Sequence, residues 1–423
     1  MSTQVHATID EATVRQISDG LDEPDWLLET RLDALEALDS LDFPDVIRTP
    51  GRLWTDLEEL DYESLVDPLN AAEEKDQVGP DEAEVLSFAE AVDEHEDLLR
   101  GHFGSVVDPE TNYLTALSTA LFSTGTVVHV PEGVNAEDVT VRTSMNSRSL
   151  FNYTLVVAEE SSSVTLLERQ TSAERSSADR SSGQSPREET GESVEGDRYY
   201  SGVVEVAAGE NAYVQYGSLQ NLDQETYNFQ IKEGVIDTYG QIDFIDCNAG
   251  SRLSKSTVET HLDGDSSEAR IVGVFYGHDD QHFDIDARVW HNDENTTADL
   301  VTRGVIDDEA RSVYEGVQDV GREAWNTSSY QRENTLMLSE ESEADASPKL
   351  IINNHDTEAS HSATVGQVDE EDMFYMTSRS VPERAAKNML VEGFYVPVLE
   401  EIEVDELRDD FSALVRERLA DRD

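Results

Sequence analysis

The 423-residue sequence predicts a mainly β protein, a β-solenoid between helical ends. Three observations predict this class. Apolar residues follow a helical spacing up to about residue 105, strand–turn–strand segments recur at intervals of about 20 to 30 residues after it, and helical stripes return near the C-terminus. We therefore expect an N-terminal helical domain (1–105), a β-solenoid core (106–377) and a C-terminal helical domain (378–423).

The first hundred residues carry the apolar spacing of helices. Val14, Ile17 and Leu21 lie three to four positions apart, and Pro24 precedes a second such run. A third helix is expected over residues 82–99. These helices would cover one end of the β region.

The β region consists of repeated segments in which an apolar strand, an acidic or small-residue turn and another strand follow one another. The clearest copies begin at Val127, Leu155 and Val203. A jelly roll or sandwich is the alternative, but the unequal strand spacing and the lack of two-residue hairpin turns favour a solenoid. The interval 171–197 has no large apolar residue, so we expect a disordered surface loop there.

The stretch 349–401 is where the β pattern ends. Strands are expected at 350–352 and 373–376, and a helix after them. Ser378 or Ser380 could cap this helix, with Pro382 early in it and Glu383 in its first turn.

Two apolar stripes mark the C-terminal helices, and they could dock on the chain's own core or in a partner's groove. The first stripe contains Ala385, Ala386, Met389, Leu390 and Phe394. The second stripe contains Leu407, Phe411, Leu414, Val415 and Leu419.

The net charge of −62 comes from 92 acidic and 30 basic residues spread along the chain. Such a surface suits molar salt, where the Debye length falls to about 3 Å and self-repulsion matters little. A surface for a basic partner is the alternative. A nucleic-acid partner is excluded, because phosphate binding needs clustered Lys and Arg. The N-terminus does not resemble a signal peptide and no long apolar run is present, so we expect a cytoplasmic protein with no membrane contact.

Common catalytic signatures are absent: the chain has no phosphate-binding loop with Lys, no G-x-S-x-G and no H-E-x-x-H. The polar candidates in 277–291 are His278, His282, Asp284, Asp286 and His291. On a strand, three of these side chains would share one face, which suits either a metal site or a solvated face.

Two further residues could be ligands. The single cysteine, Cys247, rules out an intrachain disulfide and is either a thiolate ligand or a small buried hydrophobe. His361 lies between small residues that would admit a ligand or another chain.

Residues 360–394, SHSATVGQVDEEDMFYMTSRSVPERAAKNMLVEGF, resemble the C-terminal core of the SufB/SufD family, scaffold proteins of the SUF iron–sulfur cluster assembly system. The segment with Gln281, His282, Asp284 and His291 resembles another family motif. The runs RGVIDDEARSVYEG and EPDWLLETRLDALEAL each resemble a further motif of the family. The resemblance covers nearly all of the chain except 171–197.

The resemblance implies a right-handed parallel β-helix and a non-catalytic scaffold role, closer to SufD than to SufB. It implies a heterodimer with a SufB homologue and a SufC ATPase bound by the C-terminal helical region. The SufC-contact candidates are Arg379, Ala386, Met389, Leu390 and Phe394. The family's cluster-ligand histidine matches His361, while Ala359 replaces a frequent cysteine.

A cluster takes four ligands, mostly thiolates, so a chain with one cysteine holds no cluster stably alone. We expect a transient iron–sulfur cluster at the level of the complex, with His361 as a tentative metal ligand and the other ligands from a partner. The alternatives are a SufB-like scaffold that builds the cluster, or a β-helix carbohydrate-active enzyme with Asp284 and Asp286 as acid and base.

Overall fold

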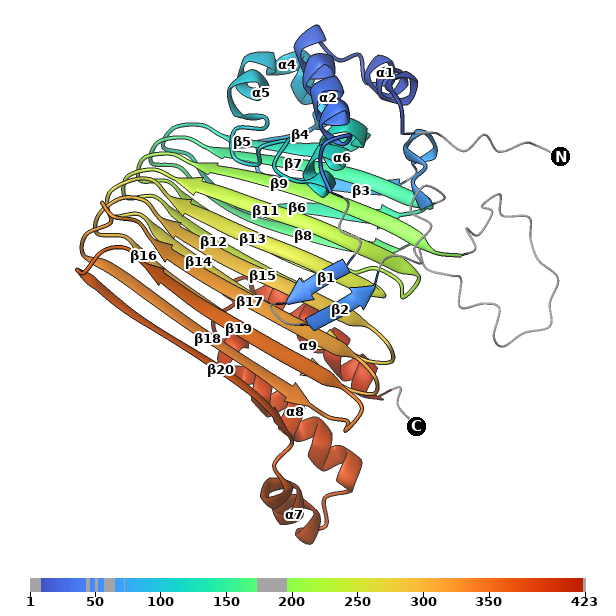
Figure 1. Ribbon diagram of the computed structural model, residues 1–423, viewed down its shortest axis with the longest axis vertical. Helices are drawn as coiled ribbons and strands as arrows, with labels where there is room; N and C mark the ends of the chain where they lie inside the picture. The colour runs from blue at the N-terminus through green and yellow to red at the C-terminus, as the bar shows by residue number, and fades with distance from the viewer. Residues whose placement is uncertain are drawn as a thin grey trace, which may run out of the picture.

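The computed structural model describes residues 9–42, 46–49, 52–56, 65–71, 73–172 and 196–420. It is a β-solenoid of about eight turns with helices at both ends (Figure 1), which confirms the predicted fold class. The loop expected over 171–197 lies outside the described residues except at its two ends.

The solenoid consists of two nine-stranded sheets, and each full turn adds one strand to each sheet. Sheet 1 contains β3 (Glu73–Val78), β6 (Asn135–Met145), β8 (Ser163–Ser172), β10 (Tyr213–Asn221), β12 (Gln241–Asn248), β14 (Glu268–Gly277), β16 (Thr297–Ile306), β18 (Thr327–Met337) and β20 (Thr357–Gln367). Sheet 2 contains β4 (Glu84–Ser87), β5 (Thr124–Val130), β7 (Ser149–Ala158), β9 (Arg198–Ala208), β11 (Thr226–Ile236), β13 (Leu253–Leu262), β15 (His282–His291), β17 (Arg311–Val320) and β19 (Glu343–Ile352). A separate antiparallel ribbon pairs β1 (Val46–Thr49) with β2 (Arg52–Asp56).

Successive turns stack in parallel register. Leu253 pairs with His282, which pairs with Arg311, so one turn takes 29 residues there. The corner after a sheet 2 strand repeatedly holds a residue with positive φ, such as Asn211 or Asn295. The N–H of Asn295 donates to the carbonyl of Trp325 in the next turn. Asn tolerates this left-handed conformation, so the corners can stack without glycine.

The space between the sheets is partly apolar and partly polar. Val128, Val156 and Val206 stack in the apolar part. In the polar part, Lys232 Nζ lies 2.7 Å from Asp246 Oδ1, and both side chains are buried. Asp246 also accepts hydrogen bonds from serine side chains, so the buried charge is fully partnered.

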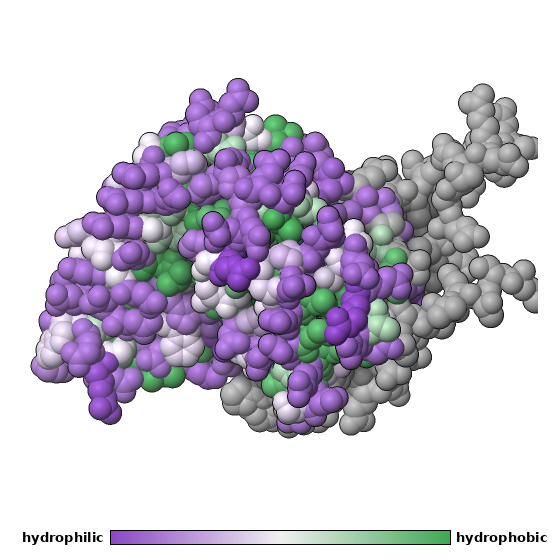
Figure 2. Space-filling model, turned by 90° about the horizontal axis from the view of Figure 1, so that it is seen from above, coloured by the Kyte–Doolittle hydropathy of each residue, from purple (hydrophilic) through white to green (hydrophobic). Residues whose placement is uncertain are grey.

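Helices and antiparallel strands close the N-terminal end of the solenoid (Figure 1). The helical elements are α1 (Glu11–Gly20), α2 (Asp25–Ala37), η1 (Pro68–Asn70), α4 (Phe88–Glu94), α5 (Glu96–His102) and α6 (Tyr113–Leu121). Strands β3 and β4 run antiparallel to β6 and β5 and end the parallel ladders. Seen from this end, the surface is mainly hydrophilic, with separate small hydrophobic areas (Figure 2).

The buried side chain of Arg31 in α2 connects this helix to α6. Arg31 donates to the Glu23 carboxylate and to the carbonyls of Thr119 and Ala120 at the end of α6. Its guanidinium also stacks on Phe122, 3.7 Å from the ring centre. These contacts satisfy carbonyls that a helix end would otherwise leave without a partner.

The expectation that the first 105 residues are helical is wrong for part of them, because β1 to β4 lie there. The helix expected over 82–99 is interrupted. Glu84–Ser87 pair with β5, Ser87 then forms a capping box with Glu90, and His95 separates α4 from α5.

Three helices follow β20: α7 (Glu370–Ser378), α8 (Glu383–Leu399) and α9 (Asp405–Ala420). Helices α8 and α9 pack on the outer face of sheet 1, where Tyr395 and Phe411 are buried against its apolar residues. The second predicted stripe therefore docks on the chain's own sheet, with Leu414 only partly buried.

Two local predictions at this junction are wrong. Residues 373–376 belong to α7 and are not a strand. Neither Ser378 nor Ser380 caps α8, because Pro382 is its N-cap and Glu383 its first residue. Ser380 instead takes a positive φ of 68° after α7. An apolar run of four residues suits either a strand or a helix. Here the acidic first turn after Asp369 favours a helix.

Candidate functional site

The C-terminal end of the solenoid is open. Strands β19 and β20 are the outermost strands of their sheets, and no described strand pairs with their free edges. Every residue of β20 is at least partly exposed. Uncovered strand edges offer unpaired N–H and C=O groups to another chain.

His361 lies on β20 within this open turn. It pairs with Gln331 of β18, whose side chain is buried, whereas His361 is exposed. Residues in register on parallel strands share a face, so His361 lies on the face that a further turn would cover. Ala359, two residues earlier on the same strand, provides no thiol beside His361.

A buried carboxyl group lies one strand inside the open end. Glu333 is in register with Ala363, and its carboxylate accepts a 2.6 Å hydrogen bond from the Thr335 hydroxyl. Burial raises the pKa of Glu333 to about 7, while hydrogen bonds from Thr335 and the Thr364 backbone oppose this shift. The burial of Glu333 follows from the fold, so inspection of sequence motifs missed this residue.

Exposed hydrophobic side chains gather around the open end. Ile351, Ile352 and Val365 belong to its last turn. Helix α7 buries none of its residues, and its Phe374 and Tyr375 are 74% and 60% exposed. In Figure 1, α7 projects beyond the last strands. Large exposed apolar side chains beside a free sheet edge indicate a protein-interaction surface.

The predicted ATPase-contact residues are differently placed. Arg379 is exposed and stacks on Tyr375, 5.3 Å from its ring centre, and Met389 is exposed. Leu390 and Phe394 are half-buried. Ala386 is fully buried, so it supports α8 from beneath and its side chain is not available to a partner in this structure.

The polar candidates of 277–291 do not converge on a metal geometry. Lys255 Nζ lies 3.2 Å from Asp284 Oδ1 and 3.2 Å from Asp286 Oδ2. Burial lowers the pKa of His282 to about 3 and that of His291 to about 4. His278 contacts Asp279 and Arg418. The two groups of described residues with metal-ligand geometry lie elsewhere.

A cavity of about 520 Å³ lies between the segment around α6 and sheet 2. Its charged lining includes Lys255, Asp284 and Asp286. Burial alone would lower the pKa of Lys255, but the two aspartates raise it above its ordinary value. Both carboxylates therefore belong to a closed ion-pair cluster, an arrangement unlike the separate acid and base of a glycoside hydrolase.

Cys247 is fully buried beneath the C-terminal helices. Burial and the neighbouring Asp246 raise the pKa of its thiol well above the ordinary value. A thiol in these surroundings is inert, which favours its interpretation as a small hydrophobe.

The geometry is that of an interaction surface at the end of a solenoid, where His355 and His361 are both exposed. Comparison with known proteins identifies the family. The family model described as SUF system FeS cluster assembly, SufBD core domain, matches residues 141–394, and the SufBD N-terminal region model matches residues 56–141. The chain belongs to the SufB/SufD family.

Curated relatives match over almost their whole length. SufD of Bacillus subtilis is 26% identical over 99% of this chain and 100% of the relative. SufB of Bacillus subtilis is 26% identical over 93% and 89%, respectively. A SufBD family protein of Staphylococcus saprophyticus is also 26% identical, over 93% and 90%. Within the described residues, no helix has the length and apolar character needed to cross a membrane.

Proposed function

We propose that this chain is a non-catalytic, SufD-like scaffold subunit that supports iron–sulfur cluster assembly together with a SufB homologue and a SufC ATPase. The observation that carries the proposal is the open last turn. It combines a free edge on each sheet, the exposed His361 and exposed apolar residues of β19 and β20.

The sister scaffold is proposed to bind at this end. A parallel solenoid whose last strands each have a free outer edge can be continued by strands of a homologous chain. Such a contact would cover Val365 and Ile352 and place His361 at the junction between two subunits. A thiolate from the partner and this imidazole could then share a transient cluster.

The ATPase is proposed to dock on the adjoining α7–α8 segment. This segment presents Phe374, Tyr375, Arg379 and Met389 next to the open turn. Half-buried Leu390 and Phe394 lie along α8, and buried Ala386 anchors that helix. An ATPase bound here would act on the junction through a helix attached directly to β20.

The SufB-like alternative is less favoured by the chain's chemistry. Its one thiol is buried beneath α8 and α9, so persulfide sulfur has no exposed acceptor here. We propose further that the protein works in the cytoplasm at molar salt, which the dispersed charge of −62 supports.

Co-expression with homologues of SufB and SufC tests the assembly. We expect one complex in size-exclusion chromatography at molar salt, with all three chains in the peak. Separate elution of this chain at micromolar concentration would contradict the proposal.

His361→Ala tests the ligand role. The complex should still assemble, because the substitution removes one exposed side chain, while the cluster content after anaerobic reconstitution should fall. His355→Ala is the matched control, since His355 is also exposed and contacts Trp325 in a corner. Equal cluster content in all three proteins would remove His361 from the set of ligands.

A further inference from the structure

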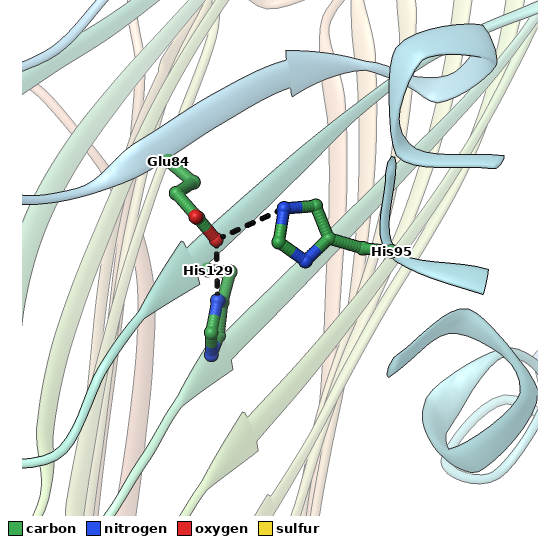
Figure 3. A group of neighbouring side chains, drawn as sticks. All are labelled: Glu84, His95 and His129. Atoms are coloured by element: carbon green, nitrogen blue, oxygen red, sulfur yellow. Dashed lines mark hydrogen bonds and ion pairs between the residues drawn. The ribbon is translucent and has the colours of Figure 1, made fainter. Parts of the chain in front are cut away.

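A group of imidazole and carboxylate side chains lies at the opposite, N-terminal end of the solenoid. Glu84 of β4 and His129 of β5 are directly paired across the two antiparallel strands. His95 occupies the break between α4 and α5. Figure 3 shows that the three side chains point toward one another. Glu84 Oε2 lies 2.7 Å from His129 Nδ1 and 3.3 Å from His95 Nε2.

The second nitrogen of His129 faces another carboxylate. His129 Nε2 lies 3.0 Å from Glu159 Oε1, and the other oxygen of Glu159 accepts the backbone N–H of Glu132. A carboxylate only accepts hydrogen bonds, so each nitrogen of His129 must carry either a proton or a metal ion. A metal ion at Nδ1 would leave Nε2–H to donate to Glu159, the usual outer-shell arrangement of a metal-bound histidine.

The ligand atoms already have nearly the spacing that a metal ion needs. Ligand distances of about 2.0 to 2.2 Å in a tetrahedral site place neighbouring ligand atoms roughly 3.3 Å apart. The ligand atoms of Glu84, His95 and His129 all lie within 4.8 Å of one another. Their side chains are 41%, 26% and 14% exposed, so an ion can enter from solvent and keep water as a further ligand.

The charges around the group also favour a cation. In the described part of the chain, Glu84 and Glu159 form ion pairs with imidazoles only. His102 is a further titratable neighbour: burial and His129 lower its pKa, and Glu159 opposes this shift. No arginine or lysine of the described chain therefore competes for the two carboxylates.

The second group with metal-ligand geometry, Glu233, Glu259 and His261, is less suitable. Arg288 Nη1 lies 3.4 Å from Glu259 Oε1, and the Trp290 indole N–H donates to the other oxygen. A guanidinium already neutralises that carboxylate, so a divalent ion there would meet a positive neighbour.

We propose that Glu84, His95 and His129 bind a borderline divalent transition-metal ion, Zn²⁺ or Fe²⁺, with Glu159 as the outer-shell partner of His129. Two imidazoles and one carboxylate suit these ions better than Mg²⁺ or Ca²⁺, which prefer oxygen ligands. The ion would connect the break between α4 and α5 to the antiparallel strand β4 and to β5, the first strand of a parallel ladder. It would thus fasten the helical cover to the solenoid.

Metal titration of the full chain tests this site. Chelator-treated protein is dialysed at molar KCl against Zn²⁺, against Fe²⁺ without oxygen, and against Mg²⁺, and bound metal is measured by mass spectrometry. We expect wild type to bind one Zn²⁺ or Fe²⁺ more than His129→Ala or Glu84→Gln, with no such difference for Mg²⁺. Glu159→Gln should weaken binding about tenfold, as outer-shell changes do.

His261→Ala is the matched control and should bind as wild type does. Circular dichroism checks that each variant is folded. If His129→Ala does not fold, Glu84→Gln alone is compared with wild type. The proposal is overturned if wild type and Glu84→Gln bind equal amounts of both transition metals, if the loss appears in His261→Ala instead, or if the Mg²⁺ arm shows the same difference.

Discussion

The two ends of the solenoid differ in whether their outermost strands are covered. At the N-terminal end, β3 and β4 run antiparallel to their neighbours, and six helical elements among the described residues cover the first turns. At the C-terminal end, no described strand pairs with the outer edges of β19 and β20, and α8 and α9 pack on the outer side of sheet 1 instead of over the end. Free edges of this kind are normally avoided, so the uncovered end supports the proposal that a partner binds there.

Both ends of the solenoid also contain buried charged or ionisable groups. At the covered end, buried charge is paired within the chain, as in the ion pair of Arg31 and Glu23. At the open end, Glu333 is buried with one carboxylate oxygen that finds no hydrogen-bond partner. Glu73 of β3, at the covered end, likewise has a buried carboxylate oxygen without a hydrogen-bond partner, so this feature alone does not distinguish the two ends.

The largest expected effect concerns the covered end. Arg31→Ala would leave the Glu23 carboxylate buried without its partner and remove the donors to the end of α6. We expect a loss of about 3 to 5 kcal/mol in the free energy of unfolding, measured by urea denaturation. Arg15→Ala, which breaks an exposed pair with Glu11, should cost less than about 1 kcal/mol. Equal losses would show that the Arg31 pair does not hold the helical cover.

Glu333→Gln tests the open end through pH. The folded pKa of about 7 lies above the ordinary value of 4.5, so the unfolded chain loses this proton first as pH rises. Wild-type stability should therefore fall between pH 4.5 and 7 and keep that penalty above pH 7. Gln imitates the neutral carboxyl group, so the variant should be about 1 to 3 kcal/mol more stable than wild type at pH 8 and equal to it at pH 4.5.

Thermal unfolding at a series of pH values measures this difference. Glu343→Gln, on the exposed part of β19, should change stability by less than about 0.5 kcal/mol at every pH. A Glu333→Gln difference that does not depend on pH would mean that the carboxyl group has the same pKa in the folded and unfolded states, so that burial does not raise it.

A smaller effect is expected at α7. The double variant Phe374→Ser and Tyr375→Ser should leave the free energy of unfolding within about 0.5 kcal/mol, because α7 buries neither side chain. Affinity for the SufC homologue, measured by titration calorimetry, should fall at least tenfold, which is about 1.4 kcal/mol. Tyr239→Ser is the control, since Tyr239 is equally exposed in a corner where serine occurs in other turns. Unchanged affinity in the double variant would exclude α7 from the ATPase contact.

The repeat pattern alone was sufficient to predict the solenoid. Alternating apolar residues and turns rich in Asn, Asp and Ser recur along the chain, and these residues take the positive-φ corner positions that stack the turns. Strands β3 and β4 could not be predicted in this way. β3 is short and mainly polar and β4 has only four residues, and both strands form because β6 and β5 provide edges to pair with.

The sites depend even more on contacts between distant residues. His361 was recognisable from its sequence neighbours, but its exposure follows from its place in the last turn. Glu333 becomes notable only through its burial, and Glu84 and His129 meet only through the pairing of β4 with β5. Sequence spacing carries no signal for such contacts, because register and chain closure create them.

The central claim is that the open end binds a sister scaffold, and the two edges of sheet 1 provide the comparison. Val365 lies on the open edge strand β20, and Val78 lies on β3 at the other edge of the same sheet; both are exposed. The direct measurement is the affinity of each lysine variant for the SufB homologue at molar salt, since an edge lysine opposes strand pairing. We predict at least a tenfold loss for Val365→Lys and no change for Val78→Lys. Equal affinities, or a loss only for Val78→Lys, would contradict the account.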